Sequence, residues 1–191
     1  MLASPADLRI VFGVGNPGDE YVGTRHNLGF EVVDTLAHTA GRALKRLLGL
    51  EARGVLVEIA GRPVQLVQPL TYVNRCGPVL ARLRDRDGLH EDRLLVVVDD
   101  VWLEPGRLRL RAGGSDGGHN GLRSLQGNLG TDRFPRLRVG IGPAPDGVPL
   151  EAHVLSPVDP AAIASVRARA AEVVSVWAES GLERAQQVAN G

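Results

Sequence analysis

Apolar runs typical of strands alternate along this chain with segments of helical spacing, and this alternation restricts the fold more than any other feature. LRIVFGV at residues 8–14 predicts a buried strand, and RLLVVVDD at 93–100 predicts a core strand that ends on two carboxylates. Two apolar stretches that flank Gly61-Arg62 predict a hairpin. Further strands are expected at 107–111 and 135–142, and helices at 29–41, 74–88, 121–129 and from 159 onward.

This order of elements predicts an α/β fold, a single-domain three-layer sandwich in which helices cover both faces of a mixed, partly parallel twisted sheet. The 191 residues, 43% of them apolar, suffice for the core of one domain, so we expect one domain over 1–191 with a flexible leader at 1–7. PAPDGVP at 143–149 is expected to be a mobile loop. Ligand sites of such folds lie at the carboxyl ends of strands.

The charge balance argues against binding of nucleic acid or of an anionic membrane through the net charge of the molecule. Twenty-two basic and twenty-two acidic side chains cancel, so we expect no DNA partner and no attachment to an anionic membrane, and any polyanion needs a local patch. The longest apolar runs are too short to span a bilayer. The single cysteine, Cys76, excludes an internal disulfide, and with no apolar signal segment at the start it favours a cytoplasmic protein.

The stretch VFGVGNPGDEYVGTRHN at 11–27 matches the glycine pattern of dinucleotide-binding turns. A dinucleotide turn runs directly into a helix and is followed by an acid at the end of the next strand. Here Pro17 and Gly18 form a turn, the next helix is expected only near residue 29, and the nearest acid, Asp34, lies inside that helix. The second glycine-rich segment, AGGSDGGHNG at 112–121, lacks the Lys-Ser or Lys-Thr pair of a P-loop. We therefore expect no nucleotide cofactor.

Hydrolysis with a histidine base fits the remaining polar residues better. It needs a neutral imidazole, a carboxylate that orients it, and polar donors for water and substrate. The candidates are His26 or His119 as base, Asp99 or Asp100 as carboxylate, and Asn16, Asn27, Asn74 and Asn120 as donors. The asparagines have structural interpretations too: Asn16 as a turn former, Asn74 as a helix N-cap, and Asn120 in a turn dipeptide. Sequence spacing does not choose between the two histidines.

Other chemistries find less support. No pair of histidines, acids or cysteine has the spacing of a metal site, so we expect no metal. Cys76 is expected to pack as a small apolar residue, and a G-x-S-x-G serine motif is absent, which leaves water as the nucleophile. The other histidines, in helix, loop and strand-like contexts, are expected to be surface or satisfied core residues: His38, His90 and His153.

Arginines recur with a period of two in two of the expected strands. Arg107, Arg109 and Arg111 share one face of the strand at 107–111, and Arg136 and Arg138 repeat the pattern in the strand at 135–142. Such faces form either a local anion-binding patch or a solvated sheet face near an edge, and the sequence leaves both open.

The chain resembles the bacterial-type peptidyl-tRNA hydrolase family from Ile10 to the C-terminal helix. The resemblance rests on four ordered blocks: GNPGDEYVGTRHNLGF, QPLTYVNRCG, VVVDDVWLEPGRLRLR with GGSDGGHNGL, and RLRVGIG. It implies a metal-independent hydrolase without cofactor that cleaves the ester joining a peptide to the terminal ribose of tRNA. This reaction recycles tRNA from aborted translation, and the family is expected to be cytoplasmic and monomeric.

The resemblance also implies roles for individual residues. His26 resembles the general base and Asp99 its orienting acid, which is chosen over Asp100 because it lies seven residues before Gly106. Asn16 and Asn74 resemble residues that position the peptide end. Asn120 resembles a residue that holds water or substrate, His119 a residue of the site wall, and Tyr21 a residue near the tRNA end. Arg111 and Arg138 resemble two basic residues that clamp a phosphate of the tRNA.

The chain departs from the family pattern at Val73, at Cys76 and at Trp102-Leu103-Glu104, where methionine, serine and Leu-Asp-Leu are common. These positions bear on the wall of the pocket and remove no proposed catalytic group. Some relatives are thought to act in RNA processing without hydrolysis, which makes a non-catalytic RNA-binding module the alternative function. The intact set of Asn16, His26, Asn74 and Asp99 favours the enzyme. A nucleotide-binding protein remains a second alternative and would show saturable NAD or ATP binding.

Overall fold

The computed structural model describes residues 7–88 and 90–191. Apart from Asp7, the leader expected at 1–7 lies outside the described residues. The strands are β1 (Arg9–Gly13), β2 (Lys45–Arg46), β3 (Ala52–Ile59), β4 (Arg62–Pro69), β5 (Leu94–Asp100), β6 (Leu108–Arg111) and β7 (Arg136–Gly140). Each longer strand lies where the sequence predicts one, and β3 and β4 form the expected hairpin around Gly61.

The helices are α1 (Leu28–Thr39), α2 (Gly77–Asp87), α3 (Asn120–Leu129), α4 (Leu150–Val154), α5 (Pro160–Ser180) and α6 (Leu182–Asn190). The short helix α4 is not foreseen from the sequence. It corrects the strand-like context expected for His153, which is helical and buried, and whose Nε2 lies 3.0 Å from the carbonyl oxygen of Gly142. Residues 143–149 form an irregular loop between β7 and α4.

The sheet has seven strands in the order β2-β3-β4-β1-β5-β7-β6. β1 runs parallel to β4 and β5, and β5 runs parallel to β7. The two outer parts of the sheet are antiparallel, with β3 on β4 and β6 on β7. The mixed, partly parallel sheet predicted from the sequence is thus confirmed, and the carboxyl ends of β1, β4, β5 and β7 share one edge.

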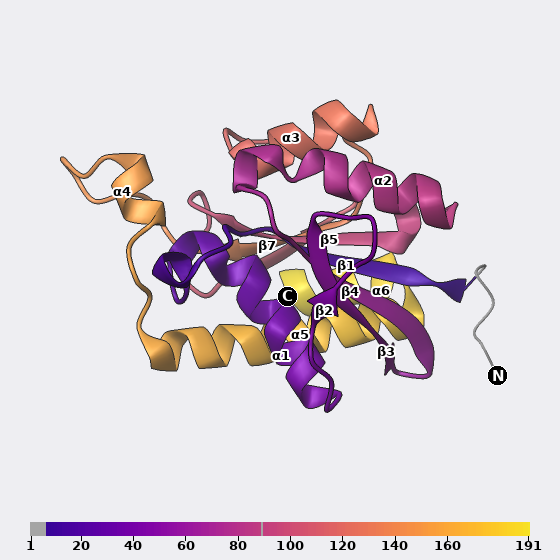
Figure 1. Ribbon diagram of the computed structural model, residues 1–191. Helices are drawn as coiled ribbons and strands as arrows, with labels where there is room; N and C mark the ends of the chain where they lie inside the picture. The colour runs from indigo at the N-terminus through magenta and orange to yellow at the C-terminus, as the bar shows by residue number, and fades with distance from the viewer. Residues whose placement is uncertain (1–6, 89) are drawn as a thin grey trace.

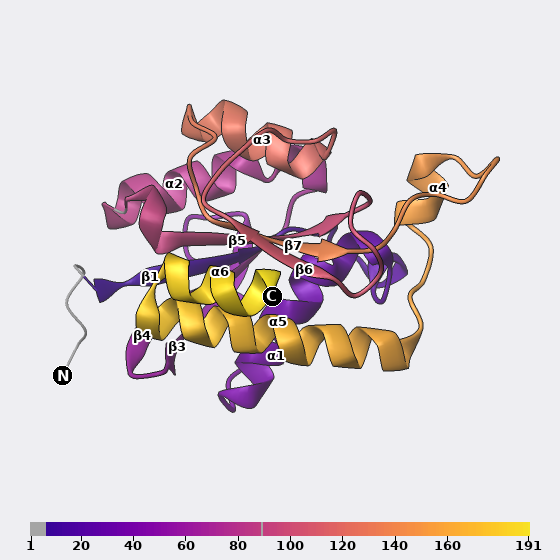
Figure 2. The same cartoon turned by 180° about the vertical axis from the view of Figure 1, so that it is seen from behind.

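Helices lie on both faces of this sheet, which confirms the predicted three layers. Helices α2 and α3 cover one face, while α1, α5 and α6 cover the other (Figures 1 and 2). Side chains alternate along β1: Ile10 and Phe12 join the core beneath α2 and α3, and Val11 joins the core beneath α1, α5 and α6. Successive side chains of a strand point to opposite faces of the sheet, and both faces are covered by helices. This explains why the central strands are continuously apolar.

Helix α1 approaches the central strands unusually closely through two glycines. A Cβ on Gly13 would lie 2.3 Å from the carbonyl oxygen of Gly29, and a Cβ on Gly29 would lie 2.4 Å from the carbonyl oxygens of Val14 and Val97. Backbone atoms cannot yield to such contacts. The first glycine of G-V-G-N-P-G therefore serves helix packing, and α1 begins only at Leu28, well beyond the turn.

Side chains of the last helix, α6, form hydrogen bonds with the outward-facing peptide groups of the edge strand β6. The amide of Leu110 donates to Oδ1 of Asn190 at 2.9 Å, and its carbonyl accepts from Nδ2 of Asn190 at 3.2 Å and from Nε2 of Gln186 at 3.3 Å. Side chains of α6 thus satisfy the peptide groups at the centre of this edge.

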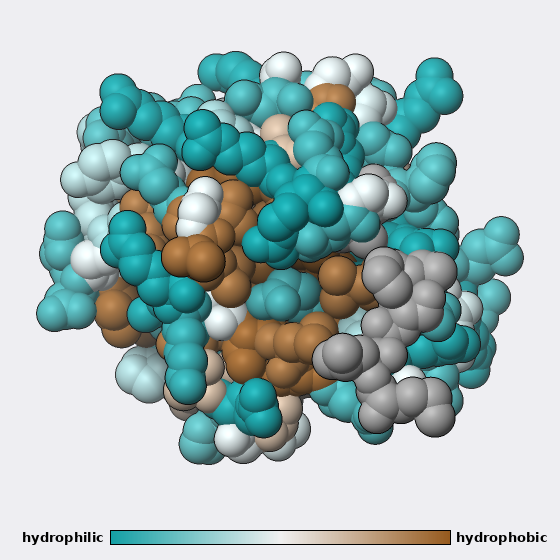
Figure 3. Space-filling model, turned by 45° about the vertical axis from the view of Figure 1, so that its right-hand side comes forward, coloured by the Kyte–Doolittle hydropathy of each residue, from teal (hydrophilic) through white to brown (hydrophobic). Residues whose placement is uncertain are grey.

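On the face seen in Figure 3, apolar side chains gather around a hollow and hydrophilic side chains surround them. Large apolar side chains that remain exposed include Leu48, Leu56, Tyr72 and Trp102. None of the described helices combines the length and the apolar character needed to cross a membrane.

Candidate active site

A pocket of about 840 Å³ lies at the edge where the parallel strands end. The segment after β1 contributes Asn16 and His26, the segment after β4 contributes Tyr72 and Asn74, and the end of β5 contributes Asp99. The loop before α3 adds His119, and α4 closes one side. The expectation that sites lie at the carboxyl ends of the strands therefore holds for this pocket.

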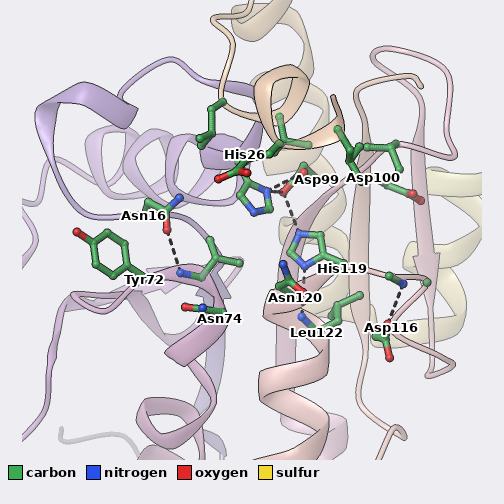
Figure 4. A pocket seen from close by; sticks show the side chains of 18 of the residues that line it. Asn16, His26, Tyr72, Asn74, Asp99, Asp100, Asp116, His119, Asn120 and Leu122 are labelled. Carbon is green, nitrogen blue, oxygen red and sulfur yellow. Dashed lines mark hydrogen bonds and ion pairs between the residues drawn. The ribbon is translucent and has the colours of Figure 1, made fainter. Parts of the chain in front are cut away.

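The carboxylate of Asp99 lies between two imidazoles. Nδ1 of His26 is 2.8 Å from Oδ1 and 3.0 Å from Oδ2 of Asp99, and Nε2 of His119 is 3.0 Å from the same Oδ1 (Figure 4). Asp99 is only 2% exposed. A carboxylate accepts hydrogen bonds, so both ring nitrogens that face it carry protons.

The remaining contacts of His119 fix its tautomer. Its Nδ1 accepts hydrogen bonds from the backbone amides of Gly121 at 3.1 Å and Leu122 at 3.3 Å, so His119 is the N-cap of α3. Because Nδ1 is an acceptor, the proton of the neutral ring resides on Nε2, which donates to Asp99. His119 thus joins α3 to the acid.

The same contacts shift two ionisation equilibria. Burial raises the pKa of Asp99, but the two histidines outweigh burial through charge and hydrogen bonding, and the pKa lies well below its ordinary value. Burial lowers the pKa of His26, yet the charge of Asp99 and its hydrogen bond dominate, and the net pKa is raised above 6.5. Nε2 of His26 makes no hydrogen bond to any described residue, and the ring lines the pocket.

Asn16 is held rigidly beneath the histidine. Its backbone amide donates to Oδ1 of Asn27 at 2.8 Å, and its carbonyl accepts from Nδ2 of Asn27 at 3.0 Å. Its side-chain Oδ1 accepts from the amide of Val73 at 2.9 Å, which identifies the other end of the amide as Nδ2. That NH₂ group has no hydrogen-bond partner among residues 7–88 and 90–191, and the side chain lines the pocket.

The opposite wall is formed by the segment after β4. Asn74 lies in a single 3-10 turn, is exposed and makes no capping hydrogen bond; α2 begins at Gly77 with Cys76 as its N-cap residue. The N-cap interpretation of Asn74 is therefore wrong. Tyr72 packs edge-on against Tyr21, with ring centroids 6.4 Å apart.

Cys76 is fully buried in the core, as expected from its sequence context. Burial raises the pKa of its thiol to about 12. A thiol of that acidity is not a nucleophile near neutral pH.

Asp100 turns to the other end of the pocket. Its Oδ2 lies 2.8 Å from Nε of Arg138 in an ion pair, and its Oδ1 accepts the amide hydrogen of Trp102 at 2.9 Å. The structure therefore brings Asp99, and not Asp100, against His26.

The arginines expected on one strand face have different environments. In the register of β6 and β7, Arg109 lies directly opposite Arg138, and Arg111 lies directly opposite Arg136. The side chains of all four arginines therefore project from the same face of the sheet. Arg136 is only 1% exposed and donates to the carbonyls of Gly114 and Asp132; its burial lowers the pKa to about 10. Arg136 therefore cannot contribute to the anion patch that the sequence pattern suggests. Arg111 is exposed, lies outside the pocket lining, and forms no ion pair with a described residue.

Among residues 7–88 and 90–191, His26, Asp99 and His119 also form a cluster whose composition could hold a metal, because one ligand atom from each lies within 4.8 Å of the others. Sequence spacing did not reveal this cluster, since its members are far apart in the chain. The two nitrogens that face Asp99 act as hydrogen-bond donors here, however, and a metal ligand must be unprotonated. The observed contacts favour a hydrogen-bonded triad.

Comparison with known proteins agrees with the fold. The family model described as peptidyl-tRNA hydrolase matches residues 10–191. The chain belongs to the peptidyl-tRNA hydrolase family. A peptidyl-tRNA hydrolase of Lachnospira eligens is 40% identical over 95% of this chain and 99% of its own length, and one of Chloroflexus aggregans is 43% identical over 92% and 95%. The crystal structure of peptidyl-tRNA hydrolase from Acinetobacter baumannii superposes with a TM-score of 0.89, at 30% identity, over 99% of this chain and 97% of that one.

The peptidyl-tRNA hydrolase resemblance inferred from four sequence blocks is thereby confirmed. The structure gathers most residues that the resemblance singles out into one pocket, namely Asn16, Tyr21, His26, Asn74, Asp99, His119, Asn120 and Arg138. Only Arg111 stands apart from it. Their individual roles are taken up below as proposals.

Several residues of this peptidyl-tRNA hydrolase pocket were not singled out as site residues from the sequence. Tyr72 and Trp102 form exposed aromatic walls of the pocket. The helix α4 contributes Leu150 and Glu151. Tyr72 and Trp102 lie beside residues that the motifs do identify, so an exposed aromatic next to a motif was the available signal.

Proposed function

We propose that this chain hydrolyses the ester between a peptide and the 3′-terminal ribose of tRNA, with His26 as general base and water as nucleophile. The observation that carries the proposal is the contact of His26 Nδ1 with the buried carboxylate of Asp99 at 2.8 Å. That contact fixes the proton on Nδ1 and leaves Nε2, in the pocket, as the basic nitrogen. Asp99 also stabilises the imidazolium that forms when the ring accepts a proton.

The proposed reaction follows from these atoms. Nε2 of His26 removes a proton from water, and the oxygen attacks the carbonyl carbon of the ester. The tetrahedral intermediate collapses, and the ribose oxygen leaves and takes the proton from the imidazolium. Free tRNA and a peptide carboxylic acid are released, and the acid loses its remaining proton to solvent. The NH₂ group of Asn16 is available to donate to the developing oxyanion.

The two ends of the pocket suit the two parts of such a substrate. Asn16, Asn74 and the tyrosine pair lie on one side, where we place the peptide. Arg138 lies on the other side, and Arg111 is its diagonal neighbour across β6 and β7. Diagonal cross-strand neighbours are roughly 7–8 Å apart, close enough for two guanidinium groups to hold one phosphate. We propose that Arg111 and Arg138 clamp a phosphate of the tRNA.

The test compares substrates and variants in the presence of a chelator. Pure protein is incubated with N-acetylated aminoacyl-tRNA and with the uncapped form, and release of free tRNA is measured. We expect release from the capped substrate without added metal. In His26→Ala, turnover should fall by roughly 10²- to 10⁴-fold, the usual contribution of a positioned base. Binding of tRNA should remain within about twofold, because the proposed role of His26 is chemical.

His38→Ala is the matched control, because His38 lies exposed on α1 and away from the pocket. It should leave turnover unchanged. Equal loss of binding and turnover in His26→Ala would instead assign His26 a structural role. Binding of tRNA without release by the intact protein would favour the alternative of a non-catalytic RNA-binding module.

We further propose that the protein acts as a monomer in the cytoplasm. A single buried thiol suits a reducing compartment, and the α6 side chains that bond to the edge strand β6 leave little there for a second copy to pair with. A mass in solution equal to one chain supports the first part, and a dimer would contradict it.

A further inference from the structure

We propose that the indole of Trp102 is a stacking surface for a nucleobase in the unpaired 3′ end of the tRNA substrate. This inference rests on the proposed function and extends it to a specific contact with the RNA.

Trp102 is exposed, yet its position is fixed at both ends. Its backbone amide donates to Oδ1 of Asp100 at 2.9 Å, and its indole Nε1 donates to the carbonyl of Gly117 at 3.1 Å. The residue remains 75% exposed. Two anchors leave the side chain little freedom to lose on binding, while most of the ring surface stays open to a ligand. A large exposed aromatic that is held in place is typical of a recognition site.

The neighbours of Trp102 are those of an RNA site. Gly117 separates the indole from Arg138: a Cβ at Gly117 would lie 3.4 Å from Arg138 Nη2 and 4.0 Å from Cδ1 of Trp102. The aromatic surface of Trp102 and the guanidinium group of Arg138 therefore lie close to each other at Gly117. Unpaired RNA alternates bases with phosphates, and proteins bind it by combining aromatic surfaces with cationic groups.

The position along the chain relates this surface to the reacting ester. Trp102 follows Asp99 by three residues, so their Cα atoms are separated by at most about 11 Å. Asp99 holds the proposed base. A group that stacks on Trp102 therefore lies within a nucleotide or two of the ester.

A peptide side chain is the competing occupant, and the layout of the pocket disfavours it. The amide groups of Asn16 and Asn74 and the ring of Tyr72 lie across the pocket from Asp100 and Asp116 (Figure 4). Tyr21 packs against Tyr72, and Asp116 directly precedes Gly117. Arg138 lies beside Gly117, and Arg109 and Arg111 lie on the same face of the sheet in the adjacent edge strand β6. Guanidinium groups are therefore available beside the indole and on the neighbouring strand for the phosphates of a tRNA.

The test measures binding of uncharged tRNA, intact and with its unpaired 3′ nucleotides removed, to the wild type, Trp102→Ala and Trp102→Phe. We expect Trp102→Ala to weaken binding of intact tRNA on the order of 5- to 100-fold, the range of base–aromatic stacking, and to leave binding of truncated tRNA unchanged. Trp102→Phe keeps a ring and should lose less than Trp102→Ala. Because the only other tryptophan, Trp177, is fully buried, quenching of the exposed indole by intact tRNA should disappear in both variants.

Equal weakening for intact and truncated tRNA would overturn the inference, as would unchanged binding of both. The indole would be assigned to the peptide instead if Trp102→Ala impaired only turnover and not tRNA binding. In that case the defect should vary with the amino acid attached to the tRNA, and Trp102→Leu should restore turnover. An unchanged melting temperature in Trp102→Ala excludes unfolding as the cause. Failure of the wild type to release tRNA would refute the proposed hydrolysis, whereas the binding comparison does not depend on turnover.

Discussion

At the scale of single residues, the site is organised by one buried negative charge with two imidazole donors. His26 presents Nδ1 to Asp99 and keeps Nε2 in the pocket, whereas His119 uses both nitrogens inside the protein. The two histidines, which sit in similar sequence contexts, are therefore not equivalent. Only His26 has a nitrogen left for substrate chemistry.

The raised pKa of His26 predicts the pH dependence of turnover. The proposed base works when neutral, so kcat/KM should fall as the pH drops through a pKa that lies above 6.5. In Asp99→Asn the charge that stabilises the imidazolium is absent, so the midpoint of this acid limb should move to lower pH while the plateau also falls. A pH–rate profile of both proteins measures the shift. An unmoved midpoint in Asp99→Asn would contradict the assignment.

The residue patterns alone left two choices open, and the structure shows why. Between His26 and His119, and between Asp99 and Asp100, nothing in the spacing decides, because side-chain contacts across 73 and 20 positions depend on how the strands pair. The family resemblance named His26 and Asp99. It gave no indication that His119 caps α3, since that function depends on the conformation of the loop.

At the scale of elements, His119 links Asp99 to the start of α3. His119→Ala removes both the helix cap and one donor to Asp99, and loss of a cap costs about 0.5–2 kcal/mol. The melting temperature should fall by about 2–4 °C per kcal/mol. His119→Asn restores a capping oxygen but is too short to repeat the contact with Asp99. We therefore expect it to recover the melting temperature and to remain slower than the wild type.

Thermal unfolding and steady-state kinetics of the same two variants separate these effects. If His119→Asn recovered both quantities together, the contact between His119 and Asp99 would be without catalytic importance.

The contact of α1 with β1 predicts a strong effect of one methyl group. In Gly29→Ala the new Cβ would meet the carbonyl oxygens of Val14 and Val97, so we expect destabilisation of about 1–3 kcal/mol or more. Gly127→Ala is the control: Gly127 is exposed within α3 and a Cβ there meets nothing within 4 Å, so stability should rise by about 0.5–1 kcal/mol. Urea unfolding midpoints measure both changes. Similar values for the two variants would contradict the close packing.

Most elements were predictable because their apolar periods are clear. The strand at 94–100 and the hairpin around Gly61 lie within a residue or two of their predicted positions. The exceptions are short. Helix α4 has five residues and follows a segment rich in proline and glycine, and the start of α2 is displaced from Asn74 to Gly77 by a 3-10 turn. Segments of this length contain less than two periods of a helix and depend on tertiary contacts.

At the scale of the whole molecule, equal numbers of acids and bases leave the proposed RNA binding to a few local contacts. Each phosphate contact contributes roughly one unit to the slope of log K against log salt. Arg111→Ala should reduce that slope by about one unit. Arg138→Ala should do the same and also raise KM, since it leaves Asp100 without its partner.

Arg86→Ala is the matched control, because Arg86 lies on α2 and pairs with Asp87. For Arg86→Ala, the slope of log K against log salt should equal that of the wild type. Titration of tRNA binding at several salt concentrations measures all three variants, and an unchanged slope in Arg111→Ala would remove that residue from the clamp.

The hydrogen bonds that join Asn190 and Gln186 to Leu110 bear on how copies of this molecule behave toward one another. An edge strand with free peptide groups invites a strand of a neighbouring chain to extend the sheet. Here the C-terminal helix fills that place with its own amide side chains, so the margin of the sheet offers little to an intruding strand. The last two turns of α6 thus oppose edge-to-edge association through β6, although they lie far in sequence from most residues that line the pocket.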